Sequence, residues 1–208
     1  MDPLVVIIPV KSAGKKSRLS DLLSSTQRGQ FSKLMLRNVL RALSQAGLGR
    51  IHVVSSDVEI LEFAQGHGAK PVPEASDSGV NEAVRTGIRA THAKEYLILP
   101  SDLPFLGPSD LLSMLKLWAG GLDLVVSPSC AFDGTNALLF APGTNFPLSY
   151  DRDSFWNHLY SAAKLELSVG VCSRIGVMFD IDTPEDFRSL ATSPGRSPPV
   201  EFSRAALK

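Results

Sequence analysis

LVVIIPV, residues 4–10, is a continuous apolar run rich in β-branched side chains near the start of the chain. Such a run is typical of a strand that is buried on both faces of a parallel sheet. It is too short to span a membrane, and Asp2 precedes it where a secretory signal peptide carries positive charge. The run therefore predicts a buried strand of an α/β domain.

Strand-like and helix-like segments alternate along the chain after this run. Apolar runs predict strands at residues 51–55, 69–72, 96–99 and 122–127. Apolar spacing and terminal residues predict helices at 26–46, 57–65, 81–91 and 108–118, the first with Thr26 as its N-cap and Gly47 as its C-cap. The alternation indicates a mostly parallel sheet with helices on both faces, whose ligands bind beyond the carboxyl ends of the strands.

The pattern changes after residue 131. Strands are expected at residues 137–140, 167–172 and 177–181, in mixed directions, with a helix at 154–164. Thr183, followed by Pro184, is a strong N-cap for a last helix. Prolines after Ser193 indicate poor order. We therefore expect a single domain over residues 1–192 and a flexible C-terminal tail over residues 193–208.

The charges of the chain balance overall but not locally. The 208 residues carry 21 Lys+Arg and 21 Asp+Glu, which disfavours a nucleic-acid binder. Residues 1–50, however, have nine basic side chains against Asp2 and Asp21, a net +7, so the remaining 12 basic and 19 acidic residues carry −7. Two distant cysteines, Cys130 and Cys172, suggest no disulfide framework, and a reducing cytoplasm fits best.

A basic loop follows the first predicted strand, where loops face the ligand crevice. It contains Lys11, Gly14, Lys15, Lys16 and Arg18. Cations offset the charge of a nucleoside triphosphate, and a glycine lets backbone N–H groups approach phosphate oxygens. The spacing of a Walker A loop is absent. A solvated basic surface loop is the alternative.

Carboxylates stand at two further strand ends. Asp102 follows the strand at 96–99. Asp180 and Asp182 flank Ile181 at the end of the strand expected at 177–181, where residues two apart point to one side. Carboxylate and phosphate oxygens together suit Mg²⁺. A turn or capping aspartate is the commoner alternative for Asp102, whereas Thr183 already caps the helix that follows Asp182.

Two loop segments could contact a small ligand. In DGTNALLF, residues 133–140, the turn residues Gly134, Thr135 and Asn136 present hydroxyl, amide and main-chain donors that suit a phosphate or carboxylate, although Asp-Gly is also a common hairpin turn. Gly79 either accommodates a base or ribose or only starts a helix. His158 is interpreted as a structural helix residue. No zinc cluster or hydrolase triad is visible in the sequence.

Six motifs in this order resemble the 2-phospho-L-lactate guanylyltransferase family (CofC-like), within the nucleotidyltransferases of glycosyltransferase-A type, over about residues 1–190. They are PVK with KSRL, GVNEA, SDLP, DGTNAL, SFxxH and DIDTPED. The resemblance implies a three-layer α/β/α, Rossmann-like fold with a mostly parallel twisted sheet, of nucleotide-diphospho-sugar transferase type. It implies that GMP from GTP is joined to 2-phospho-L-lactate, giving lactyl diphosphoguanosine and pyrophosphate in coenzyme F-420 biosynthesis, with Mg²⁺ as cofactor.

The resemblance and the patterns above together suggest a role for each candidate residue. Lys11, Lys16 and Arg18 would contact phosphates and, with Asp102, form the catalytic set. Gly14, Gly79 and Asn81 would bind the nucleotide. Asp102, Asp182 and Asp180 are the metal candidates. Lys11, Thr135, Asn136 and Ser154 would bind the phospho-acid. The chain departs from the family at Tyr150-Asp151, where relatives often carry Phe/Tyr-Gly, which puts the shape of the acceptor pocket in question.

The expected chemistry is in-line attack of the acceptor phosphate on the α-phosphorus of GTP, which needs no protein nucleophile. Phosphoenolpyruvate, 3-phosphoglycerate, or a cobinamide or molybdopterin phosphate are alternative acceptors. A haloacid-dehalogenase-type phosphatase would use Asp180, Asp182 and Thr183, but only 26 residues follow Asp182. A non-catalytic nucleotide-binding domain is the third alternative. The expected partners are small molecules, without nucleic acid or membrane, and a homodimer is left open.

Overall fold

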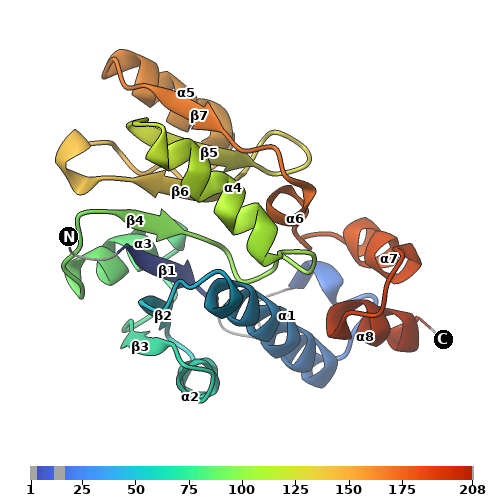
Figure 1. Cartoon of the computed structure of the whole chain (residues 1–208). Helices are drawn as coiled ribbons and strands as arrows, with labels where there is room; N and C mark the ends of the chain where they lie inside the picture. The colour runs from blue at the N-terminus through green and yellow to red at the C-terminus, as the bar shows by residue number, and fades with distance from the viewer. Residues whose placement is uncertain (1–3, 12–16, 208) are drawn as a thin grey trace.

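Strand β1 (Val5–Pro9) occupies an inner position of a seven-stranded sheet (Figure 1). The computed structural model describes residues 4–11 and 17–207. The strand order is β3-β2-β1-β4-β6-β5-β7. The other strands are β2 (Ile51–Ser55), β3 (Lys70–Pro73), β4 (Tyr96–Ile98), β5 (Leu124–Pro128), β6 (Thr135–Phe140) and β7 (Val169–Val171). Only β6 runs antiparallel to its neighbours β4 and β5, which confirms the mostly parallel α/β sheet.

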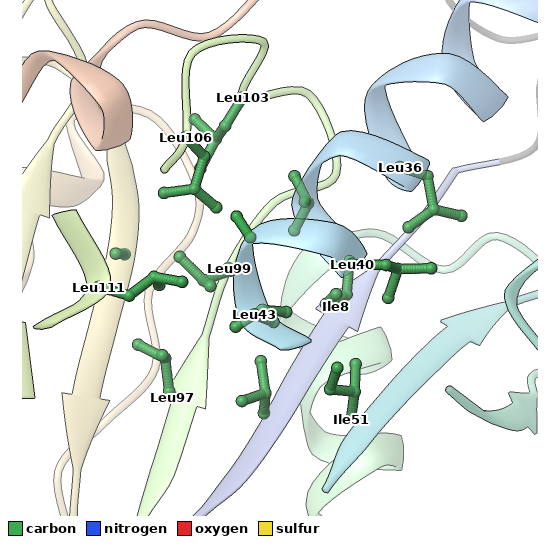
Figure 2. Close-up of a cluster of buried hydrophobic side chains, with 14 of the residues drawn as sticks. Ile8, Leu36, Leu40, Leu43, Ile51, Leu97, Leu99, Leu103, Leu106 and Leu111 are labelled. Carbon is green, nitrogen blue, oxygen red and sulfur yellow. The ribbon is translucent and has the colours of Figure 1, made fainter. Parts of the chain in front are cut away.

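Alternate residues of β1 face two separate helix layers. Val6 and Ile8 pack against the layer of α1 (Ser25–Gln45), α2 (Val58–Gln65) and α4 (Pro108–Ala119). Figure 2 shows Leu36, Leu40 and Leu43 of α1 above this face of the sheet. The opposite face is covered by α3 (Val80–Arg89) and α5 (Ser154–Lys164). The expected three-layer α/β/α arrangement is therefore confirmed.

The start of α1 differs from the sequence expectation by two residues. Its N-cap is Ser24 rather than Thr26. The Ser24 side chain accepts a hydrogen bond from the backbone N–H of Gln27, and the Gln27 side chain accepts one from the backbone N–H of Ser24. This reciprocal capping box satisfies two amide donors of the first turn, whereas Thr26 has no glutamine or glutamate three residues later.

The segment expected to be a strand at residues 177–181 forms a short helix, α6 (Ile175–Met178), followed by an irregular turn. The prediction was wrong because this segment satisfies its carbonyls differently. The Asn136 side-chain amide donates to the carbonyls of Val177 and Met178, at 3.1 and 2.9 Å, and the Met178 carbonyl also accepts from the backbone N–H of Cys130 at 2.9 Å.

The C-terminal segment also differs from the expected flexible tail. Its residues form α8 (Pro198–Ala206), which packs against α7 (Pro184–Thr192) and against the first half of α1 (Figure 1). Val200 is buried, and the Phe202 ring stacks on Phe31 with centroids 5.3 Å apart. Pro198 starts the helix, a position where its missing N–H costs nothing.

The described residues also contain two short 3-10 turns, η2 (Ser17–Leu19) and η3 (Pro142–Thr144). In the described part of the chain, none of the helices is both long enough and apolar enough to cross a membrane.

Candidate active site

A cavity of about 380 Å³ opens at the edge of the sheet where the parallel strands end. β6 runs antiparallel, so its first residues reach the same edge as the ends of β1 and β4. The cavity lies beyond the carboxyl ends of the strands, as the alternating pattern predicts. Predicted residues that line it are Lys11, Arg18, Gly79, Asp102, Thr135, Asn136, Ser154, Asp180 and Asp182.

One candidate residue is placed otherwise, and two lie outside the described residues. Asn81 is not among the lining residues. Its side chain accepts a hydrogen bond from the backbone N–H of Tyr150 at 2.8 Å and donates to the Asp151 carboxylate at 3.1 Å. Asn81 thus ties α3 to the segment that departs from the family pattern. Gly14 and Lys16 lie outside the described residues, as does Lys15.

The acidic side of the cavity combines Asp102, Asp180 and Asp182. Burial, together with the negative charges of Asp102 and Asp182, raises the pKa of Asp180 to about 7. The Asn136 amide donates to Asp180 Oδ1 at 3.2 Å, which opposes this shift. Asn136 therefore positions the turn that carries Asp180, and strand alternation is not the reason that the carboxylates share one cavity.

The loop after β4 that carries Asp102 is attached to helix α1. The buried Asn38 side chain donates to the carbonyl oxygens of Leu103 and Pro104, at 3.1 and 3.2 Å. Both carbonyls lie within two residues of Asp102, so the attachment limits how far this carboxylate can move relative to the sheet.

The carboxylates fit a magnesium ion that is shared with a nucleotide. Their oxygens are hard ligands, and a cation would relieve the repulsion that raises the pKa of Asp180. Within residues 4–11 and 17–207, no three His, Cys, Asp or Glu side chains form a ready-made metal group. Mg²⁺ is commonly held by one or two carboxylates together with substrate phosphates. The residues present therefore suit that shared mode rather than a site made by protein ligands alone.

The basic side of the cavity consists of Lys11 and Arg18 among the described residues. A guanidinium nitrogen of Arg18 lies 3.4 Å from Asp182 Oδ2, and both side chains are well exposed, at 70% and 59%. An exposed pair of this kind contributes little to stability. Arg18 is therefore held only loosely beside the Asp182 carboxylate, and both side chains line the cavity.

A third wall is made of neutral hydrogen-bonding groups. The Ser154 hydroxyl oxygen accepts from the Thr135 backbone N–H at 2.8 Å. The Thr135 hydroxyl lies 2.9 Å from Nδ1 of His158, and the Ser149 backbone N–H donates to Nε2 of that ring at 3.0 Å. His158 is fully buried, and burial lowers its pKa to about 4. The imidazole is therefore neutral at pH 7.

Sequence reasoning missed several residues of this site. His158 was interpreted as a structural residue, which its full burial supports, but its contact with the Thr135 hydroxyl was not predicted. The signal was the four-residue spacing of Ser154 and His158, which places both on one helix face. Glu74 and Asp77 also line the cavity. Glu74 directly follows β3, so the rule about strand ends could have identified it.

The sequence is similar to those of known guanylyltransferases. The model of the family described as "Guanylyl transferase CofC like" matches residues 4–195. The phosphoenolpyruvate guanylyltransferase of Rubrobacter xylanophilus is 40% identical over 91% of this chain and 94% of its own. The 2-phospho-L-lactate guanylyltransferase of Methanocaldococcus jannaschii is 34% identical over 87% of this chain and 79% of its own.

Solved structures show the same fold at low identity. A Desulfovibrio desulfuricans protein named after the nucleotide-diphospho-sugar transferases has a TM-score of 0.75 and 16% identity, covering 99% of this chain and 95% of that one. A nucleotidyl transferase from Methanothermobacter has a TM-score of 0.66 and 15% identity, covering 97% and 98%. The expected fold type, that of the nucleotide-diphospho-sugar transferases, is therefore confirmed.

Proposed function

The chain belongs to the CofC-like guanylyltransferase family and is thus a nucleotidyltransferase, and on this premise we propose that it joins the GMP unit of GTP to the phosphate of a three-carbon 2-phospho acid. Pyrophosphate is the other product. Two acceptors are favoured by specific relatives. Phosphoenolpyruvate is named in the relative at 40% identity, and 2-phospho-L-lactate in the relative at 34%.

The two acceptors have the same charged groups in the same order. In each, the carboxylate and the phosphate ester are both attached to the second carbon. This carbon is planar in phosphoenolpyruvate and tetrahedral in 2-phospho-L-lactate. With 2-phospho-L-lactate the product is lactyl diphosphoguanosine, an intermediate on the way to coenzyme F-420. With phosphoenolpyruvate the product is the corresponding enol compound.

One observation carries the proposal: a single cavity brings together cations, carboxylates and neutral donors. The cations are Lys11 and Arg18, the carboxylates are those of Asp102, Asp180 and Asp182, and the neutral donors are Thr135 and Ser154. A nucleoside triphosphate and a phospho-acid are both polyanions, and bringing them together requires charge neutralisation on each side of the reacting phosphorus. A cavity with cations alone would bind these substrates but would lack carboxylates for a metal.

The proposed reaction forms one bond and breaks one. An oxygen of the acceptor phosphate attacks the α-phosphorus of GTP, and the bond from this phosphorus to the oxygen bridging the α- and β-phosphates breaks. The electron pair leaves with pyrophosphate. The acceptor phosphate is already ionised at pH 7, so no general base is needed, and catalysis consists of positioning and charge neutralisation.

Each wall of the cavity has a task in this scheme. Lys11 and Arg18 offset the charge of the phosphates. Asp102 and Asp182 would hold Mg²⁺, which supplies charge neutralisation at the triphosphate when bound. Thr135 and Ser154 hold the acceptor.

The test is a pyrophosphate-release assay that crosses GTP, ATP and CTP with phosphoenolpyruvate, 2-phospho-L-lactate and 3-phosphoglycerate, with Mg²⁺ present. We expect release with GTP and with one or both of the 2-phospho acids, and the ratio of their kcat/KM values identifies the acceptor. Release confined to ATP would overturn the guanylyl assignment. Release of inorganic phosphate from the acceptor alone would favour a phosphatase instead.

A further inference from the structure

We propose that His158 is a positioning residue that fixes the hydroxyl of Thr135 as a hydrogen-bond donor towards an anionic oxygen of the acceptor. The identity of the bound acid rests on the proposed function. The orientation of the hydroxyl rests only on the hydrogen bonds of the described residues.

The backbone N–H of Ser149 determines the direction of the two hydrogen bonds that the His158 ring makes, with Ser149 and with Thr135. An amide nitrogen can only donate, so Nε2 of His158, 3.0 Å away, must accept with its lone pair. A neutral imidazole without a proton on Nε2 carries it on Nδ1. Nδ1 lies 2.9 Å from the Thr135 hydroxyl oxygen, so the ring donates to this oxygen. The Thr135 proton is therefore left to donate elsewhere.

The Ser154 hydroxyl is in the same situation. Its oxygen accepts from the Thr135 backbone N–H at 2.8 Å, which leaves its own proton as a donor. Both residues line the cavity, and among the described residues neither hydroxyl proton has a protein acceptor. Two O–H donors without a protein acceptor suit a group that only accepts, such as a carboxylate or phosphate oxygen.

The position of Ser154 strengthens this preference for an anion. Ser154 is the first residue of α5, an 11-residue helix whose N-terminus carries a partial positive charge. A bound anion would thus meet two hydroxyl donors and the end of a helix dipole. A ligand hydroxyl or amide would bind less well, because its own O–H or N–H donor would face the two hydroxyl donors and find no acceptor there.

The surroundings of His158 keep the ring neutral. It packs against the rings of Phe146 and Tyr150, with centroids 5.5 and 5.1 Å away, and it is fully buried. A protonated ring would place an N–H against the Ser149 N–H. Burial lowers the pKa of His158 to about 4, in agreement with this geometry.

A matched pair of substitutions separates the two hydrogen bonds of the ring. The His158→Asn side chain can place an amide N–H near the Nδ1 position and so keeps the donor to Thr135. The His158→Gln side chain can reach the Nε2 position and accept from Ser149, but it leaves Thr135 without its donor. His92 is exposed and is not among the residues that line the cavity, so His92→Asn is the control for the loss of a histidine elsewhere.

Steady-state kinetics give the first readout. We expect His158→Gln to raise the KM for the acceptor about tenfold, the usual scale for a hydrogen bond to a charged group, with the KM for GTP unchanged. His158→Asn should stay near the wild type. A purely structural role predicts similar losses in both variants, or equal changes in both KM values, and either result would overturn the proposal.

A double-mutant cycle tests whether His158 acts through Thr135. In a Thr135→Val background the hydroxyl is gone, so His158→Gln should then raise the acceptor KM no further. Additive effects of the two substitutions would contradict the proposed coupling.

The position of the ring proton gives a readout that needs no turnover. Long-range ¹H–¹⁵N spectra of protein with ¹⁵N-labelled histidine, assigned with the His158→Asn variant, should show the proton on Nδ1 at pH 7. A proton on Nε2 would overturn the proposal whatever the kinetics show. If wild-type protein turns over none of the phospho acids but the proton is on Nδ1, the proposed function fails and the orientation of Thr135 stands.

Discussion

The buried imidazole of His158 makes the stability of the fold depend on pH in a calculable way. Burial lowers its pKa from the ordinary 6.5 to about 4 in the folded protein. Between these values the unfolded chain binds a proton that the folded chain does not. The free energy of unfolding therefore falls as the pH is lowered through 6.5, and this loss stops growing below about pH 4.

The size of this effect follows from the two pKa values. From pH 7.5 to pH 5, the imidazole alone should reduce the free energy of unfolding by about 2 kcal/mol. The His158→Asn variant lacks the titrating group, so it should lose about 2 kcal/mol less than the wild type over this interval. The smaller buried side chain also changes the free energy of unfolding of the variant. This change is the same at both pH values, so it cancels when the two pH values are compared.

The assay is urea unfolding of both proteins, followed by circular dichroism at several pH values between 7.5 and 5. His52, whose pKa is also lowered by burial and by the charges of Lys70 and Arg50, titrates alike in both proteins. The difference between the two pH profiles therefore isolates His158. Parallel profiles would refute the reasoning, because they would mean that the folded and unfolded states bind this proton equally.

Three further predictions concern the sheet edge and the core. Asp102→Asn should lower kcat, measured by pyrophosphate release, by about 100-fold or more through loss of a metal ligand. It should also lower the pKa of Asp180, measured by NMR titration, because the Asp102 charge raises this pKa. Gly87→Ala should destabilise the fold by about 1–3 kcal/mol in urea unfolding, because a Cβ there would lie 2.7 Å from Ile7 Cγ2. Asn38→Ala should cost about 1–3 kcal/mol and also lower kcat, since two buried carbonyls beside Asp102 lose their donor.

Each of these predictions has a control and a contrary outcome. Near-normal turnover of Asp102→Asn would contradict the metal assignment, and a lowered melting temperature would mean that its loss of activity reflects unfolding. Gly49→Ala is the control for Gly87, because no atom lies within 4 Å of its added Cβ. If Asn38→Ala lowers stability but leaves kcat unchanged, the attachment to α1 does not position Asp102.

Local patterns in the sequence were sufficient for most of the sheet. The β-branched run at residues 4–10 predicts β1 because a strand buried on both faces needs apolar side chains at every position. Thr183 was correctly predicted to cap α7, since its side chain bonds to the N–H three residues later. The crevice at the carboxyl ends of the strands follows from the same alternation, and it places Lys11 and Asp102 at one edge before any contact is known.

Elements whose partners lie far away along the chain were predicted wrongly. The apolar residues at 177–181 have the composition of a strand, but they form the end of a short helix and a turn that is held by hydrogen bonds from the distant Asn136 amide and the Cys130 backbone N–H. The prolines near residue 198 suggested disorder, but aromatic contacts with Phe31 on α1 stabilise a helix there. Neither partner is close enough in sequence for a periodic pattern to show it.

The sequence by itself determined the α/β class, the order of most strands and helices, and several of the charged residues that meet at the sheet edge. These depend on side-chain periodicity and turn chemistry, which act over a few residues. Only the tertiary structure decided how the polar groups of the site are oriented. Thr135 and His158 are 23 positions apart, and their hydrogen bond exists because β6 and α5 pack together. Burial and hydrogen-bond direction are properties of that packing, so they set the charge of His158 and the donor role of Thr135.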